Sequence, residues 1–117
     1  MSRNIRNYDV FKISHKMVLK IYEVTKTFPR EERYGLTSQL RRSAYSIPMN
    51  LIEGGAKNSE GEFRRFVDIA IGSCAEVEYQ IELCFDLKYL NETDFYELRD
   101  NYTSIGKMLN RLYQKLK

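Results

Sequence analysis

FYELRDNYTSIGKMLNRLYQKL, residues 95–116, is the stretch that decides the predicted fold. Its large apolar side chains recur at alternating steps of three and four residues, at Phe95, Leu98, Tyr102, Ile105, Leu109, Leu112 and Leu116. This spacing places them along one side of an α-helix and is typical of helices that pack side by side. The stretch therefore predicts a long helix that begins after Asn91 or Thr93 and buries a continuous apolar seam.

Three further segments also show helical spacing of their apolar residues. They are about Asp9–Thr27, Thr37–Gly54 and Ser59–Leu90. The first ends before Pro29, because the residue that precedes a proline avoids helical backbone angles. The third begins with Ser-Glu-Gly-Glu, which predicts a capping box in which Ser59 and Glu62 each bond the other's backbone amide.

The connections between these four segments are short, so neighbouring helices are expected to be antiparallel. The sequence thus predicts an all-α chain, residues 1–117 forming one domain, folded as an antiparallel up-down-up-down four-helix bundle. A second apolar group on the third helix, Ile69, Leu83 and Leu87, points away from the main apolar face. Either a subunit interface or a broad core accommodates it.

Length, composition and charge narrow the class of protein. The chain has 117 residues, 43% hydrophobic and 30% charged, as in ordinary globular domains. It lacks an apolar leader or a membrane-length apolar run, so we expect a cytoplasmic protein without a membrane anchor. Residues 1–67 carry 13 Lys and Arg against 7 Asp and Glu, whereas residues 68–117 carry 6 against 9. This asymmetry serves an acidic partner, or it pairs basic with acidic helices.

Few residues suit catalysis or metal binding. His15 is the one histidine, and it lacks the Glu-x-x-His spacing of di-iron bundles. Cys74 and Cys84 lie ten residues, or about 15 Å, apart on one predicted helix, which is too far for a disulfide. We interpret both as buried small hydrophobic residues. Four glutamates, Glu53, Glu76, Glu78 and Glu82, form either a site or a hydrogen-bonded polar layer. We therefore expect no enzyme, cofactor or metal.

A basic segment surrounds the predicted turn between the second and third helices. It contains Arg41, Arg42, Lys57, Arg64 and Arg65. Arg42 and Arg65 point away from the apolar faces, with Tyr45 and Met49 near Arg42. Basic side chains neutralise phosphates, and a tyrosine ring stacks on an unpaired base. The alternative is an ordinary solvated face whose cations pair with Glu60, Glu62 and Asp68.

Several stretches resemble a known family. They are residues 28–44, from Phe28-Pro29-Arg30 to Ser43-Ala44, and residues 46–54, 62–66, 69–73 and 105–110. Together they resemble the four-helix-bundle proteins named for intervening sequences in bacterial 23S ribosomal RNA genes. The resemblance covers nearly the whole chain. It implies a ring-like homopentamer related to the accessory variability proteins of diversity-generating retroelements, whose basic surface binds nucleic acid and a reverse transcriptase.

For this chain, the resemblance implies RNA or DNA binding by Arg41, Arg42, Lys57, Arg64 and Arg65. The resulting hypothesis is a non-enzymatic homo-oligomeric bundle that binds nucleic acid or a ribonucleoprotein. The alternative is a protein-interaction scaffold without direct nucleic-acid contact. The acidic stretch Glu76–Asp100 and the second apolar group on the third helix fit that alternative equally well.

Overall fold

Four long helices and two short 3-10 helices make up the computed structural model, which describes residues 3–117. The long helices are α1 (Asp9–Thr25), α2 (Leu36–Gly55), α3 (Glu60–Asp86) and α4 (Glu92–Lys115). The short helices η1 (Ile5–Asn7) and η2 (Arg30–Glu32) precede α1 and α2. No strand occurs between residues 3 and 117. The predicted all-helical fold with four long helices is confirmed.

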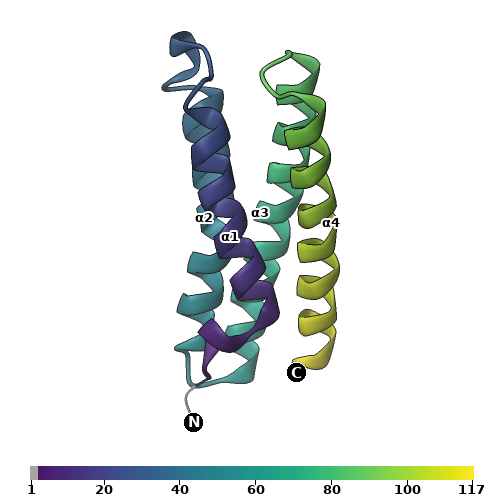
Figure 1. The fold of residues 1–117 in the computed structure, drawn as a ribbon. Helices are drawn as coiled ribbons and strands as arrows, with labels where there is room; N and C mark the ends of the chain where they lie inside the picture. Colours follow the sequence, from purple (N-terminus) through teal and green to yellow (C-terminus); the bar gives the residue numbers. More distant parts are fainter. Residues whose placement is uncertain (1–2) are drawn as a thin grey trace.

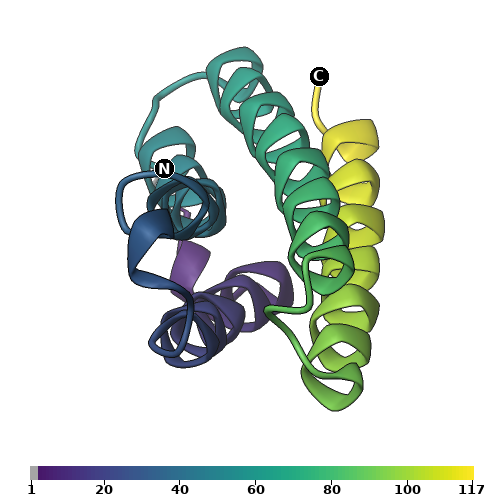
Figure 2. The same cartoon turned by 90° about the horizontal axis from the view of Figure 1, so that it is seen from above.

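The helices form an antiparallel bundle in which each long helix reverses the direction of the one before it (Figure 1). Each packs against its neighbour in sequence, and α1 closes the arrangement by packing against α4. Seen from above, the α3–α4 pair lies beside α1 and α2 (Figure 2). The bundle measures 45 × 24 × 20 Å. Within the described part of the chain, no helix has both the length and the apolar character needed to span a membrane.

The predicted seam of α4 supplies one side of the core. Leu98, Tyr102, Ile105 and Leu109 are fully buried, with 0% of their surface exposed. Phe95, Leu112 and Leu116, at the two ends of the seam, are partly buried and pack against the same core. The alternating spacing therefore predicted the buried face of this helix, and the ends of the bundle account for the partial exposure.

Two helix ends differ from the sequence predictions. α1 ends at Thr25 rather than Thr27. α3 ends at Asp86, four residues before the predicted Leu90. Lys88 adopts the left-handed conformation, with φ 65°, and its N–H bonds the Phe85 carbonyl while the Tyr89 N–H bonds the Cys84 carbonyl. These two bonds form a Schellman motif, a helix ending usually marked by glycine.

Side chains cap the starts of the last two helices. Asn91 Oδ1 accepts from the Asp94 N–H at 2.7 Å, which selects Asn91 over Thr93 as the cap of α4. Ser59 Oγ accepts from the Glu62 N–H at 3.1 Å, as predicted. The other half of the predicted capping box is wrong: in the described residues the Glu62 carboxylate bonds Arg65 instead of the Ser59 amide.

Helices α2 and α3 approach each other closely at Gly54. A Cβ atom at this position would lie 2.5 Å from Phe66 Cβ, so the approach requires a residue without a side chain. Further along the same pair of helices, the Ser46 and Ser73 hydroxyls share a hydrogen bond of 2.8 Å. These two contacts set the register of α2 against α3 and therefore the relative heights of the basic residues that they carry.

Candidate nucleic-acid interface

The five predicted basic residues fall into two groups along the bundle. Gly54 of α2 lies beside Phe66 of α3, and therefore at about the height of Arg65. Arg42 is 12 residues before Gly54 in α2, which corresponds to about 18 Å along the helix. Arg41 and Arg42 thus lie well apart from Lys57, Arg64 and Arg65. The predicted single patch is two patches.

Arg41 and Arg42 follow each other on α2 but face different neighbours. The Arg41 Nε donates to Thr25 Oγ1 at 2.8 Å and its Nη2 to the Tyr22 carbonyl at 3.4 Å. Its guanidinium also lies 4.5 Å from the centroid of the Tyr22 ring. A cation at the C-terminal end of a helix interacts favourably with the helix dipole. Arg41 therefore ties α2 to the end of α1.

Arg42 is exposed and lines a groove of about 400 Å³ between α2 and α3. The groove is also lined by Tyr45 and Met49, as the sequence predicted, and by Gln39, Ser43, Ser46, Asn50, Ser73 and Glu76. Between residues 3 and 117, Arg42 has no hydrogen-bond or ion-pair partner. The groove thus combines a free cation, an aromatic ring and amide side chains.

In the second group, Arg64 has a structural partner. Its guanidinium lies 3.9 Å from the centroid of the Tyr113 ring, and its Nε donates to the Tyr113 carbonyl at 3.4 Å. It therefore binds the C-terminal end of α4, as Arg41 binds that of α1. Arg3 does the same for α2, because its Nη1 lies 3.5 Å from the carbonyl of Gly55, the last residue of the helix, and 2.9 Å from that of Lys57 in the following turn. Three arginines thus complete the C-terminal ends of three helices.

Lys57 and Arg65 are the exposed cations of this second group. Both flank Phe66, at 5.5 Å and 4.6 Å from its ring centroid. Arg65 also pairs with Glu62 at 3.3 Å. The hydrogen bond from Arg65, with the charges of Arg65 and Lys57, holds the pKa of the Glu62 carboxyl below its usual value. One of the two cations is thus partly neutralised, as the solvated-face alternative predicts.

Sequence reasoning missed a third basic group, in the connection between α1 and α2. We name residues 22–41 the α1–α2 corner. Lys26, Arg30, Arg33 and Arg41 line one pocket there, of about 270 Å³. Arg30 and Arg33 flank two glutamates, so the net charge of these four residues is zero and does not reveal a basic group. Their three-residue spacing was the available signal, because residues i and i+3 of a 3-10 helix share one side.

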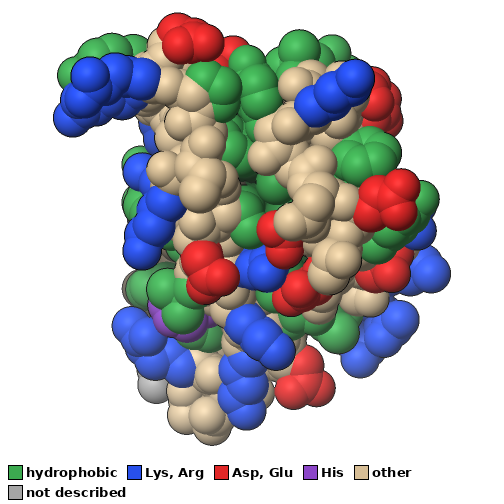
Figure 3. All heavy atoms as spheres, turned by 45° about the horizontal axis from the view of Figure 1, so that its top comes forward, with side chains coloured by type: hydrophobic (Ala, Val, Ile, Leu, Met, Phe, Trp, Pro, Cys, Tyr) green, Lys and Arg blue, Asp and Glu red, His purple; other side chains and the backbone are tan. Residues whose placement is uncertain are grey.

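Acidic residues gather on the other hairpin at the same end of the bundle. We name residues 86–100 the α3–α4 corner; it carries five Asp and Glu against two Lys and Arg. Figure 3 shows Lys and Arg side chains along the left edge and also on the right and lower parts of this face, with Asp and Glu side chains among them. The acidic excess of this corner follows from its residue counts and agrees with the acidic excess of residues 68–117.

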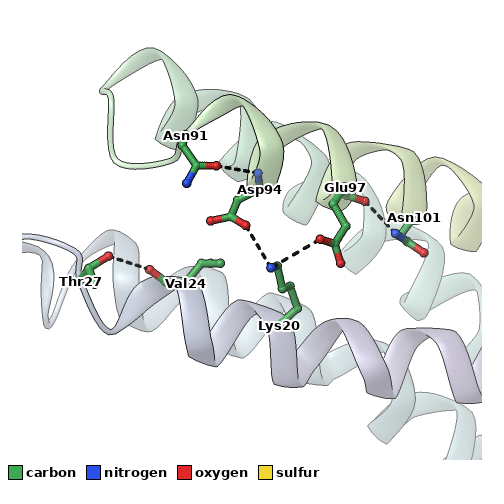
Figure 4. Close-up of polar contacts among 7 residues, drawn as sticks. All are labelled: Lys20, Val24, Thr27, Asn91, Asp94, Glu97 and Asn101. Carbon is green, nitrogen blue, oxygen red and sulfur yellow. Dashed lines mark hydrogen bonds and ion pairs between the residues drawn. The ribbon is translucent and has the colours of Figure 1, made fainter.

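Lys20 of α1 joins the first hairpin to this acidic corner. Its Nζ lies 3.0 Å from Asp94 Oδ1 and 3.5 Å from Glu97 Oε1 (Figure 4). The hydrogen bond to Asp94 is the main reason why the pKa of Lys20 is raised above its usual value. This contact neutralises part of the acidic corner and holds α1 against α4.

The described residues show no arrangement that suits metal binding. Cys74 and Cys84 are buried and free, which confirms their interpretation as small hydrophobic residues. Burial raises the pKa of each thiol to about 12, so neither is reactive near neutral pH. Burial also raises the pKa of Glu78, whose Oε1 lies 3.9 Å from Cys74 Sγ.

Comparison with known proteins adds a fold relative and a family. A crystal structure of a protein of unknown function from the S23 ribosomal protein family, from Bacteroides thetaiotaomicron, superposes with a TM-score of 0.81. The two sequences are 23% identical, over 90% of this chain and 95% of the other, so this likeness shows the fold alone. No curated protein matches the sequence significantly.

The family comparison covers most of the chain. The sequence matches the model of the family described as 23S rRNA-intervening sequence protein over residues 6–111. The matched range contains all of α1, α2 and α3 and most of α4. It also includes every basic residue discussed above except Arg3. The chain therefore belongs to the 23S rRNA-intervening sequence protein family.

Proposed function

We propose that this protein is a non-enzymatic, homo-oligomeric helical bundle that binds nucleic acid, RNA or DNA, through the groove between α2 and α3. The observation that carries the proposal is the placement of exposed, unpaired Arg42 beside Tyr45 and Met49 in that groove. An arginine that is not engaged by the fold is available to a phosphate. The neighbouring ring and thioether offer a surface on which a base stacks.

The remaining residues of the groove suit a polynucleotide. Gln39 and Asn50 carry amides that hydrogen-bond base edges or sugar hydroxyls. Glu76 also lines the groove. Its carboxylate repels phosphate, so the strand backbone lies on the α2 side, next to Arg42, and the bases face α3. Lys57 and Arg65 supply further phosphate contacts at the far end of the same pair of helices.

Self-assembly strengthens such contacts. Each chain has a formal charge of +3. In a homopentameric ring, which the resemblance implies, five copies of each weak phosphate contact act on one strand. The name of the family refers to 23S rRNA, and the S23 relative is described as ribosomal. Both names favour RNA as the first nucleic acid to test. A reverse transcriptase is the protein partner that the resemblance implies.

Charge reversal tests the groove directly. Arg42→Glu is expected to weaken binding of a mixed-sequence single-stranded RNA about tenfold or more, and Arg65→Glu to weaken it less, because Glu62 already neutralises Arg65. Fluorescence anisotropy at two salt concentrations measures both, and circular dichroism verifies helix content. Lys107→Glu, on the exposed surface of α4, is the matched control. If all three variants lose RNA affinity equally, the groove is not the binding site.

Assembly is tested by light scattering coupled to size exclusion, with and without RNA. We expect a mass of five chains that increases when RNA is added and returns as salt rises. A monomer that ignores RNA at low salt would remove both the assembly and the function.

A second candidate is a protein-interaction scaffold. Ile69 of α3 and Leu87, which follows the last residue of α3, are 42% and 44% exposed, and Tyr79 of α3 and Tyr96 of α4 are also exposed. Leu87 and Tyr96 lie within the acidic α3–α4 corner. A protein partner that remains bound after nuclease treatment, and is lost in the double variant Ile69→Ser/Leu87→Ser, would favour this function over nucleic-acid binding.

A further inference from the structure

Four cationic side chains line the pocket in the α1–α2 corner, and contacts within the fold do not engage all of them. Lys26, Arg30, Arg33 and Arg41 line it, together with Thr25, Phe28, Pro29 and Thr37. As far as residues 3–117 show, no carboxylate is among the lining residues. Arg41 is held by Tyr22 and Thr25. Lys26, Arg30 and Arg33 are exposed and take part in none of the ion pairs within the described chain.

A second observation at the same pocket is an unsatisfied hydroxyl. The Thr37 side chain lines the pocket and is 8% exposed, and its Oγ1 has no hydrogen-bond partner among the described residues. A buried hydroxyl normally has a partner, because leaving it unpaired is unfavourable. Thr37 is the second residue of α2, so its unpaired donor lies at the positive end of a 20-residue helix dipole.

The nearest helix cap leaves this donor free. Glu32 Oε1 accepts from the Leu36 N–H at 3.1 Å, and Glu32 Oε2 accepts from the Tyr89 hydroxyl at 3.0 Å. Both oxygens of Glu32 are therefore engaged. Its negative charge offsets only part of the charge of the four cations. An anion in the pocket would contact these cations, and it would accept from Thr37 after a rotation of that side chain, because Oγ1 is shielded from solvent in this conformation.

An aromatic side chain stands beside the pocket. Tyr34 is 87% exposed, and the Arg33 guanidinium lies 5.5 Å from the centroid of its ring. A ring this exposed contributes little to the fold. Arg33 therefore links the cationic pocket to a free stacking surface, which is the combination that a nucleotide requires.

We propose that the α1–α2 corner binds the phosphorylated end of a nucleic-acid strand, with the terminal phosphate in the pocket of Lys26, Arg30, Arg33, Arg41 and Thr37 and the terminal base on Tyr34. The nucleic-acid part of this assignment rests on the proposed function. A terminal phosphate monoester has three free oxygens and a charge of about −1.5 to −2, so it suits a concave four-cation pocket better than a diester within a strand.

The strand can continue from this pocket into the α2–α3 groove. Arg41 lines the pocket and the next residue, Arg42, lines the groove. A strand that starts at the corner therefore crosses α2 at these two residues. This path makes the pocket the fixed end of the proposed interface, and it predicts dependence on the terminal phosphate rather than on base sequence.

The test compares three RNA 12-mers of one sequence: with a 5′-phosphate, with a 3′-phosphate and without a terminal phosphate. For the wild-type protein we expect one phosphorylated end to bind at least about tenfold more tightly than the unphosphorylated strand. Millimolar inorganic phosphate is expected to abolish that difference by competing for the pocket. Equal affinity for all three strands would overturn the proposal.

Variants locate the effect. Lys26→Gln/Arg30→Gln is expected to remove the preference for the phosphorylated end while changing affinity for the unphosphorylated strand less than about threefold. Thr37→Val, which preserves shape and removes the hydroxyl, is expected to reduce the preference about threefold to fivefold. Tyr34→Ala is expected to weaken binding of every strand whose terminal base stacks on this ring at the corner. The matched control is Lys88→Gln/Lys107→Gln, with two exposed charges removed elsewhere; if it abolishes the preference equally, the pocket is not the site.

The pocket and the wider function can fail separately. If RNA binds but no terminal phosphate matters, the corner proposal is wrong and the groove remains. If no RNA binds, inorganic phosphate decides: an increase in Tm with phosphate in the wild type, absent in Lys26→Gln/Arg30→Gln, supports the phosphate pocket and rejects nucleic acid as its ligand. If RNA does not bind and phosphate does not change the Tm, both proposals are overturned.

Discussion

The two hairpin corners at the same end of the bundle differ in how their polar groups are satisfied. In the α3–α4 corner, Asn91 caps α4, and Asp94 and Glu97 bind Lys20. In the α1–α2 corner, the Thr37 hydroxyl and the cations Lys26 and Arg30 have no hydrogen-bond or ion partner in the described chain. The α3–α4 corner uses Asn91, Asp94 and Glu97 to stabilise the bundle, whereas the α1–α2 corner leaves Thr37, Lys26 and Arg30 unpaired within residues 3–117.

The two corners nevertheless touch. Phe28 packs against Tyr89, with ring centroids 5.3 Å apart, and Glu32 accepts from the Tyr89 hydroxyl. The Glu32 bond is also the main cause of the raised pKa of Tyr89. The two corners thus pack against each other, and they differ in how fully their polar groups are satisfied.

The largest effect is expected where the corners pack together. Phe28 is buried, and Phe28→Ala should lower the free energy of unfolding by about 3–4 kcal/mol because it leaves a cavity beside Tyr89. Urea denaturation measures the change. Tyr34→Ala, in the same connection but exposed, should stay within about 0.5 kcal/mol of wild type. A loss below about 1 kcal/mol for Phe28→Ala would mean that the corners do not pack.

The next effect should have opposite signs in the two corners. Asn91→Ala removes the hydrogen bond that caps α4 and should lower the free energy of unfolding by about 1 kcal/mol. Thr37→Val removes a hydroxyl that bonds nothing in the described chain and should raise stability by about 1 kcal/mol in phosphate-free buffer. Thermal and urea unfolding compare the two variants. If Thr37→Val destabilises as Asn91→Ala does, the hydroxyl has a partner and the contrast between the corners disappears.

A backbone change sharpens the description of the α3–α4 corner. Lys88→Gly should raise the free energy of unfolding by roughly 0.5–1 kcal/mol, because φ 65° is unfavourable for a residue with a Cβ atom. Lys88→Ala is the control, since it removes the same charge and keeps the Cβ. If both variants gain stability equally, charge rather than backbone conformation is responsible.

The smallest effect concerns the ion pairs of Lys20. Lys20→Met should cost about 0.5 kcal/mol at low salt and less at high salt. Because folding raises the pKa of this lysine, its contribution is complete below the unfolded value of 10.5 and is lost as the pH rises further. Wild type and variant should therefore converge in strongly alkaline buffer. A difference that persists there would assign the effect to packing of the lysine stem.

Periodicity predicted the elements of the fold because burial decided them. The α4 seam and the two cysteines of α3 are buried as their spacing indicated. Helix ends were harder to predict, because a helix end depends on a single residue, and the residue type that usually ends a helix is absent after α3. Lys88 takes a position that glycine normally fills, so no sequence signal ended α3 at Asp86.

The candidate site was less predictable than the fold. A helical wheel shows which residues leave the core, and it placed Arg42 beside Tyr45 and Met49 correctly. It does not show which exposed cations meet another helix. Arg41 and Arg64 bind the ends of α1 and α4, because the antiparallel arrangement brings those ends to them. Their contacts depend on distances between helices, which a single sequence does not contain.

The close approach at Gly54 also limits how the family's sequences can diverge. No side chain fits between α2 and Phe66 at this position, whereas a Cβ at Gly72 would meet nothing within 4 Å. Two glycines of one chain are therefore under unequal selection. Across homologues, position 54 should hold the same residue while position 72 drifts, and a substitution at 54 should occur only together with glycine in place of Phe66, because the Phe66 Cβ is the atom that a new Cβ would meet.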